Sequence, residues 1–83
     1  MSVSSLAVAC RAAAIWYRVG EEAAGSAELK RLTEQFIALA GAGDARVLGL
    51  LPALQELVAA QGRGDFLRVA DLLEFALAPA LRS

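Results

Sequence analysis

Residues 47–81, VLGLLPALQELVAAQGRGDFLRVADLLEFALAPAL, predict a helical hairpin. At 100° per residue, the apolar side chains of the first half fall in one stripe about 120° wide, and those of the second half also share one face. Between them, Gly62 and Gly64 predict a helix end and a tight turn, because glycine adopts positive φ without a Cβ penalty. Asp65 then predicts an N-cap. Two apolar helix faces joined by so short a turn should pack antiparallel.

The last helix carries a second apolar patch on the side that should face water. On an α-helical wheel Phe75 lies about 180° from Phe66, and Leu72 and Pro79 lie beside it. One exposed aromatic is common in soluble proteins, whereas a cluster of apolar side chains indicates contact with another subunit or protein. The candidate partner-binding residues are therefore Leu72, Phe75 and Pro79, together with Trp16 of the first helix.

The first helix should start at Ser4 or Ser5 and continue to about Glu22 or Ala24. It is apolar around most of its circumference, and a helix of this kind usually contacts more than one neighbour. One apolar side holds Leu6, Cys10, Ala13 and Tyr17, another holds Val8, Ala12, Ile15 and Val19, and Trp16 lies between them.

Two arrangements remain open for residues 4–40. Gly25 ends the first helix and Ser26 caps a second one, or the whole segment forms a single long helix. We favour the break, because each glycine inside an exposed helix costs about 1 kcal/mol. Further along, Asp44 should cap a third helix, and Pro52 should either kink this helix or lie in the first turn of a new one.

Length and composition predict a single domain, residues 1–83, of the all-α class. The expected architecture is a small antiparallel bundle of four short helices, or of one long and two short helices. The chain is 58% hydrophobic, with a mean hydropathy of +0.53, and its only cysteine, Cys10, cannot form an intrachain disulfide. Self-association would bury additional apolar surface, so the bundle should be completed by dimerisation.

The residues that usually carry chemistry are scarce. The chain has no histidine and no glycine-rich phosphate loop, and we therefore expect no enzyme activity, no cofactor and no metal. Asp71 and Glu74 are interpreted as surface charges, with Asp71 paired to Arg68 and Arg18 paired to Glu22. The net charge is −1 and the basic residues are dispersed, which disfavours nucleic-acid binding. The N-terminal apolar run contains Arg11 and is too short to span a membrane.

Residues 70–79, ADLLEFALAP, resemble an ADLLEYELxP stretch found in small uncharacterised helical proteins of bacteria. Here Phe75 stands in place of the tyrosine and Ala76 in place of the second glutamate. The resemblance implies a bacterial, cytoplasmic helical module, and a reducing cytoplasm also suits a lone buried Cys10.

Two functional hypotheses follow. The first is a non-enzymatic interaction or assembly module, similar to an adaptor or a chaperone, that forms a homodimer and contacts a protein partner. The alternative is a regulatory bundle that binds a small molecule or lipid in a cavity lined by Trp16, Tyr17 and Phe36.

Overall fold

The computed structural model describes residues 3–82, and every secondary-structure element among them is helical. The elements are α1 (Val3–Arg18), α2 (Glu22–Gly41), α3 (Ala45–Leu48), α4 (Leu51–Gly62), α5 (Phe66–Asp71), η1 (Leu72–Leu77) and α6 (Ala78–Arg82). The segments α5, η1 and α6 follow one another without a break, and we refer to them together as the last helix. The predicted all-α class is confirmed.

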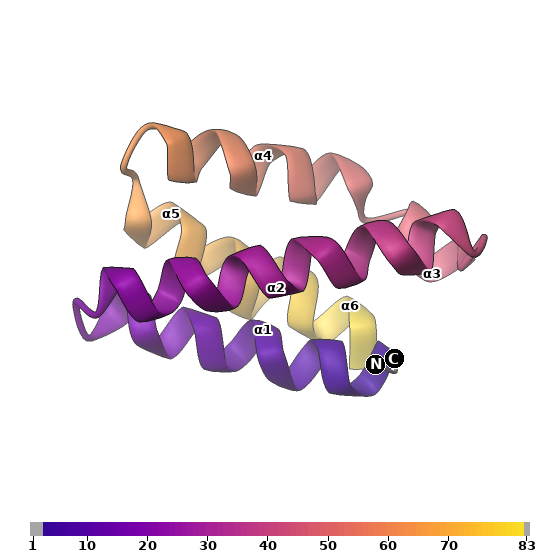
Figure 1. Ribbon diagram of the computed structural model, residues 1–83, viewed down its shortest axis with the longest axis horizontal. Helices are drawn as coiled ribbons and strands as arrows, with labels where there is room; N and C mark the ends of the chain where they lie inside the picture. The colour runs from indigo at the N-terminus through magenta and orange to yellow at the C-terminus, as the bar shows by residue number, and fades with distance from the viewer. Residues whose placement is uncertain (1–2, 83) are drawn as a thin grey trace.

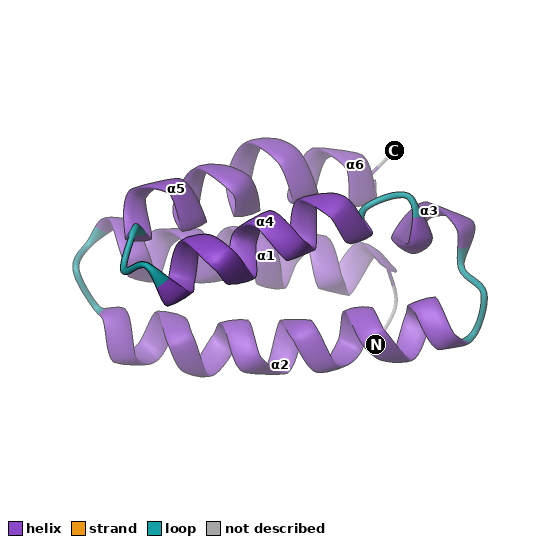
Figure 2. Cartoon of the chain, turned by 90° about the horizontal axis from the view of Figure 1, so that it is seen from above, coloured by secondary structure: helices purple, strands orange, loops and turns teal. Residues whose placement is uncertain are grey.

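The long helices run up, down, up and down (Figure 1). α1 and α2 form one antiparallel hairpin, and α4 and the last helix form another. α1 also packs against the last helix along its length, so it contacts neighbours on two sides. Figure 2 shows the two hairpins from above, with α2 and the last helix on opposite sides of the molecule. Side chains from all four long helices form the core, and the largest are Leu6, Leu32, Phe36, Leu57, Leu73, Leu77 and Leu81.

The break between α1 and α2 is real, but it lies earlier than predicted. α1 ends at Arg18, and Gly20 makes the turn with φ +82°. Gly25 is instead a buried residue inside α2, and Ser26 does not cap a helix. A Cβ on Gly25 would lie 3.0 Å from Cε2 of Tyr17. This glycine therefore permits close approach between the two helices and does not end one of them.

Both predicted aspartate caps are present. The carboxylate of Asp44 accepts hydrogen bonds from the backbone N–H groups of Arg46 and Val47 at 3.0 and 3.1 Å. Asp65 accepts one from the N–H of Arg68 at 3.3 Å, after Gly64 has made the turn with φ +74°. Pro52 lies in the first turn of α4, so a new helix begins there after the single turn of α3.

The last helix departs from α-helical geometry at η1, where the N–H of Ala78 donates to the carbonyl of Leu73, five residues earlier. Such a π segment adds one residue to a turn and shifts every later side chain around the axis. The segment ends two residues before Pro79, whose ring would crowd the carbonyl four residues before it in a regular α-helix. As a result Ala78 and Leu81 face the core. Leu72 is also buried, so its predicted place in an exposed patch is wrong.

Candidate interaction surface

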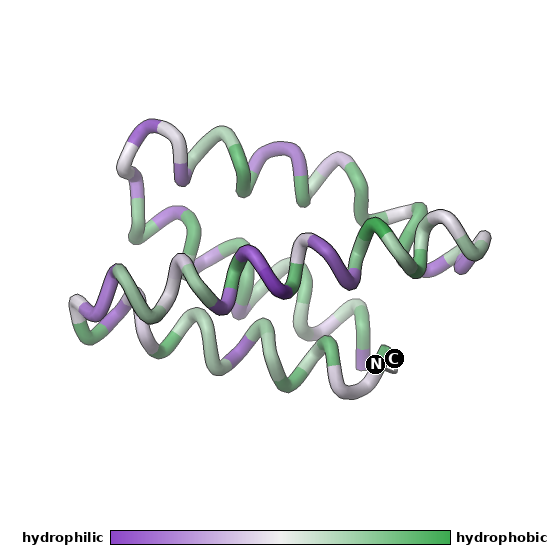
Figure 3. The backbone as a smooth tube through the Cα atoms, in the orientation of Figure 1, coloured by the Kyte–Doolittle hydropathy of each residue, from purple (hydrophilic) through white to green (hydrophobic). Residues whose placement is uncertain are grey.

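The outward side of α1 is apolar. Val8, Ile15 and Val19 keep 58%, 61% and 63% of their surface exposed, and the exposed Ala12 lies among them. Val19 directly follows the last residue of α1, and its N–H still donates to the carbonyl of Ile15 at 3.0 Å. The intervals of four, three and four residues therefore place these side chains in one line along the helix, with the heptad spacing of a helix-packing seam. We call Val8, Ala12, Ile15 and Val19 the α1 seam. In Figure 3, α1 is green along most of its length.

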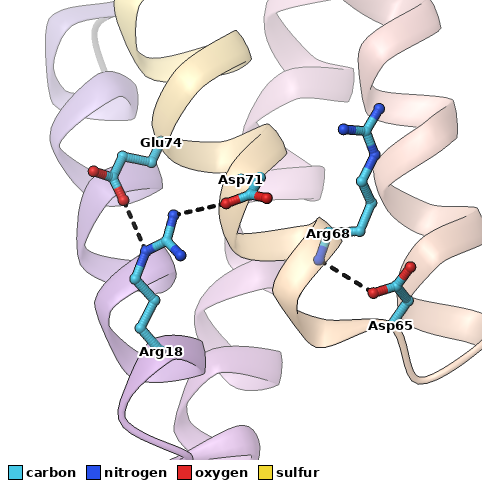
Figure 4. Close-up of polar contacts among 5 residues, drawn as sticks. All are labelled: Arg18, Asp65, Arg68, Asp71 and Glu74. Carbon is cyan, nitrogen blue, oxygen red and sulfur yellow. Dashed lines mark hydrogen bonds and ion pairs between the residues drawn. The ribbon is translucent and has the colours of Figure 1, made fainter.

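Trp16 borders the α1 seam on one side and two arginines border it on the other. Trp16 is 41% exposed. Arg11 is exposed and makes no ion pair with any residue in 3–82. Arg18 extends from α1 to the last helix, where its Nη2 lies 3.0 Å from Asp71 Oδ1 and its Nε lies 2.9 Å from Glu74 Oε1 (Figure 4). The hydrogen bonds to Asp71 and then to Glu74 raise the pKa of Arg18 above its ordinary value.

These contacts replace the ion pairs expected from helical spacing. Arg18 binds two carboxylates of the last helix and not Glu22. Arg68 pairs with Glu56 of α4 and not with Asp71. Asp71 and Glu74 do come together, but around the same guanidinium. By binding Arg18, these two carboxylates hold α1 to the last helix.

Phe75 adds an aromatic side chain to this surface. It is 67% exposed, and the Arg18 guanidinium carbon lies 5.6 Å from its ring centroid. At that distance a cation and an aromatic ring attract each other. Of the four candidate partner-binding residues, Phe75 and Trp16 are exposed, Pro79 is half-buried and Leu72 is buried.

The α1 seam was not among the candidate partner-binding residues. Its apolar spacing in the sequence predicts contact with a second neighbour. The structure places that contact elsewhere, because α1 meets the last helix through the side that carries Arg18 and meets α2 through the side that carries Tyr17. The seam therefore remains on the outside.

Tyr17 lies at the junction of four helices. Its ring stacks on Phe66, with the centroids 5.4 Å apart and the planes 18° apart. Its hydroxyl lies 3.2 Å from the Ser26 hydroxyl, and the Gln61 amide donates to both oxygens at 3.3 Å. This cluster joins α1, α2, α4 and the last helix. No buried side-chain polar atom of residues 3–82 lacks a hydrogen-bond partner.

The described residues form no pocket. Phe36 is fully buried and Tyr17 is packed against Phe66, whereas Trp16 lies at the surface. These three side chains therefore do not line a common cavity in residues 3–82. The small-molecule alternative has no structural observation in its favour.

The described residues show no reactive thiol and no group of metal ligands. Burial raises the pKa of the Cys10 thiol to about 12, so the nucleophilic thiolate is scarce at neutral pH. Across residues 3–82, no three histidine, cysteine, aspartate or glutamate side chains lie close enough together to hold a metal ion. Among these same residues, no helix combines the length and the apolar character that crossing a bilayer requires.

No family model, no curated protein and no solved structure matches this chain at a significant level.

Proposed function

We propose that this protein is a non-enzymatic interaction module of the bacterial cytoplasm, similar to an adaptor or a chaperone, that works by self-association and by contact with a protein partner. The bacterial and cytoplasmic parts of the proposal derive from the resemblance of residues 70–79 to small bacterial proteins.

One observation carries the proposal: apolar side chains are gathered on the outer side of α1, where they remain exposed. The α1 seam is exposed, with Trp16 on one side of it and with Arg18 and Phe75 on the other. Aromatic side chains and arginine are the residues most enriched at the energetic centres of protein interfaces. A soluble monomer would more commonly place charged residues on the outward face of such a helix.

The test is copurification of two differently tagged copies produced in one bacterial cell. The wild-type chain should retain its second copy, because burial of the exposed apolar set stabilises the complex. A chain with both Ile15→Asp and Phe75→Asp should lose it, and circular dichroism should show that this variant is still helical. Equal recovery of the second copy by both chains, or no recovery by either, contradicts the proposal.

A further inference from the structure

We infer that the α1 seam binds the α1 seam of a second copy of this chain, in an antiparallel pair related by a two-fold axis that passes between Ala12 and Ile15. This inference rests on the proposed function and specifies its self-association surface.

The spacing of the seam residues indicates that the seam packs against another helix. Val8, Ala12, Ile15 and Val19 follow the alternation of three and four residues that lets two helices interlock along one line. In an antiparallel pair about the stated axis, Val8 of one copy meets Val19 of the other, and Ala12 meets Ile15. A small side chain thus faces a large one near the axis, which permits close approach of the two backbones.

The exposed area is suitable for a weak dimer. Val8, Ile15, Trp16 and Val19 are each 41–63% exposed, which amounts to roughly 400 Å² of mostly apolar surface, in the range of patches that are often functional. A specific interface buries on the order of 800 Å² from each partner. The seam provides about half of this area, and the flanking Arg11, Arg18 and Phe75 lie beside it to provide the rest.

The charges beside the seam favour a second copy in the antiparallel orientation. α1 contains no acidic residue, and Arg11 is without an ion-pair partner among residues 3–82. The cluster of Arg18, Asp71 and Glu74 carries one positive and two negative charges, a net charge of −1. An antiparallel pair places Arg11 of each copy on the same side as this anionic cluster of the other, and a parallel pair places it on the opposite side. Antiparallel helix dipoles also attract each other.

A matched pair of isoleucines provides the first test. Ile15 on α1 is 61% exposed and Ile37 on α2 is 62% exposed, but Ile37 shares its outward face with Lys30 and Glu34. In sedimentation equilibrium, Ile15→Asp should weaken dimerisation at least tenfold, because it places a carboxylate in the apolar seam of each copy. Ile37→Asp should change the dissociation constant less than twofold. Val19→Asp is a second seam variant for use if Ile15→Asp is not helical by circular dichroism.

Disulfide cross-linking tests the orientation. In a Cys10→Ala background, a mixture of Val8→Cys and Val19→Cys chains should form mixed disulfide dimers, because these positions face each other in the antiparallel pair. Val8→Cys alone should not cross-link, since its two copies are separated by eleven residues, or about 16 Å along the axis, beyond the reach of a disulfide.

Each result that contradicts the expectation overturns a different part of the proposal. A monomeric wild-type chain overturns both the self-association in the proposed function and this inference. A wild-type dimer that survives the seam variants, or that is broken equally by Ile37→Asp, overturns this inference alone. Cross-linking of Val8→Cys with itself overturns the antiparallel pairing, and a wild-type monomer whose seam binds lipid vesicles assigns the surface to a membrane instead.

Discussion

Gly25 sets the distance between α1 and α2. The ring of Tyr17 lies only 3.0 Å from the position that a Cβ would take, and this ring has little freedom to move because it is stacked on Phe66 and its hydroxyl is held by Ser26 and Gln61. A helical glycine ordinarily gains stability from replacement by alanine, but here the added methyl has no space.

We expect Gly25→Ala to lower the free energy of unfolding by about 1 to 2 kcal/mol, since overpacking outweighs the gain in helix propensity. Urea denaturation measures the change. Gly41→Ala is the control, because a Cβ there meets nothing within 4 Å, and it should gain about 0.5 kcal/mol. A stabilised Gly25→Ala would show that Tyr17 can move aside.

Cys10 should be inert in the folded protein. Its pKa is raised by burial from 9.0 to about 12, so between these values the folded chain keeps its proton while the unfolded chain loses it. The free energy of unfolding should therefore fall as the pH rises above about 9, by up to about 1.4 kcal/mol per pH unit.

Thiol labelling and denaturation at several pH values check this expectation. Wild type should react with a thiol reagent only in denaturant, and Cys10→Ala should lack this part of the loss of stability at alkaline pH. Rapid labelling of the folded protein at neutral pH contradicts the burial of this side chain.

At the scale of the helices, some boundaries could be predicted from the sequence and others could not. Asp44 and Asp65 were identifiable as caps because each precedes an apolar helical pattern and follows a glycine. The end of α1 was misplaced because, in the sequence alone, Gly20 and Gly25 are equally suited to end a helix. Only the packing of Tyr17 shows that Gly25 is needed for close approach, which leaves Gly20 to make the turn.

The π segment was not predictable for a similar reason. A helical wheel assumes a constant angle per residue, and one inserted residue changes the phase of everything after it. The core face predicted by the wheel includes Val69, Leu73 and Ala80. It is largely correct up to Leu73, whereas beyond it Ala78 and Leu81 are buried and Ala80 is only partly buried.

Removal of the inserted residue should restore a regular helix. Deletion of Phe75 together with Pro79→Ala moves Leu77, Ala78 and Leu81 back by one position, into phase with Val69 and Leu73 on an α-helical wheel. This chain should fold with a melting temperature within a few degrees of the Pro79→Ala chain, because its core side chains are retained.

Deletion of Glu34 in α2 is the matched control. α2 has no π segment, so this deletion rotates the buried Phe36 out of the core and should cost several kcal/mol. Thermal unfolding followed by circular dichroism compares the variants. Equal damage from both deletions contradicts the interpretation of η1 as a one-residue insertion.

At the scale of the whole molecule, the monomer is well packed. Its accessible surface is 4470 Å², close to the roughly 4,700 Å² expected of a folded monomer of this mass. A shortage of buried area in the single chain therefore does not argue for a partner. The position of the exposed side chains indicates a partner instead, because Val8, Ile15 and Val19 are aligned on one face and Phe75 lies across Arg18 from them.

Sedimentation equilibrium of the wild-type chain over a range of micromolar concentrations tests the central claim most directly. We predict a mass that rises with concentration toward twice the 8.7 kDa of one chain, because each copy buries the α1 seam of the other. A helical protein that keeps the mass of one chain at every concentration would contradict the account.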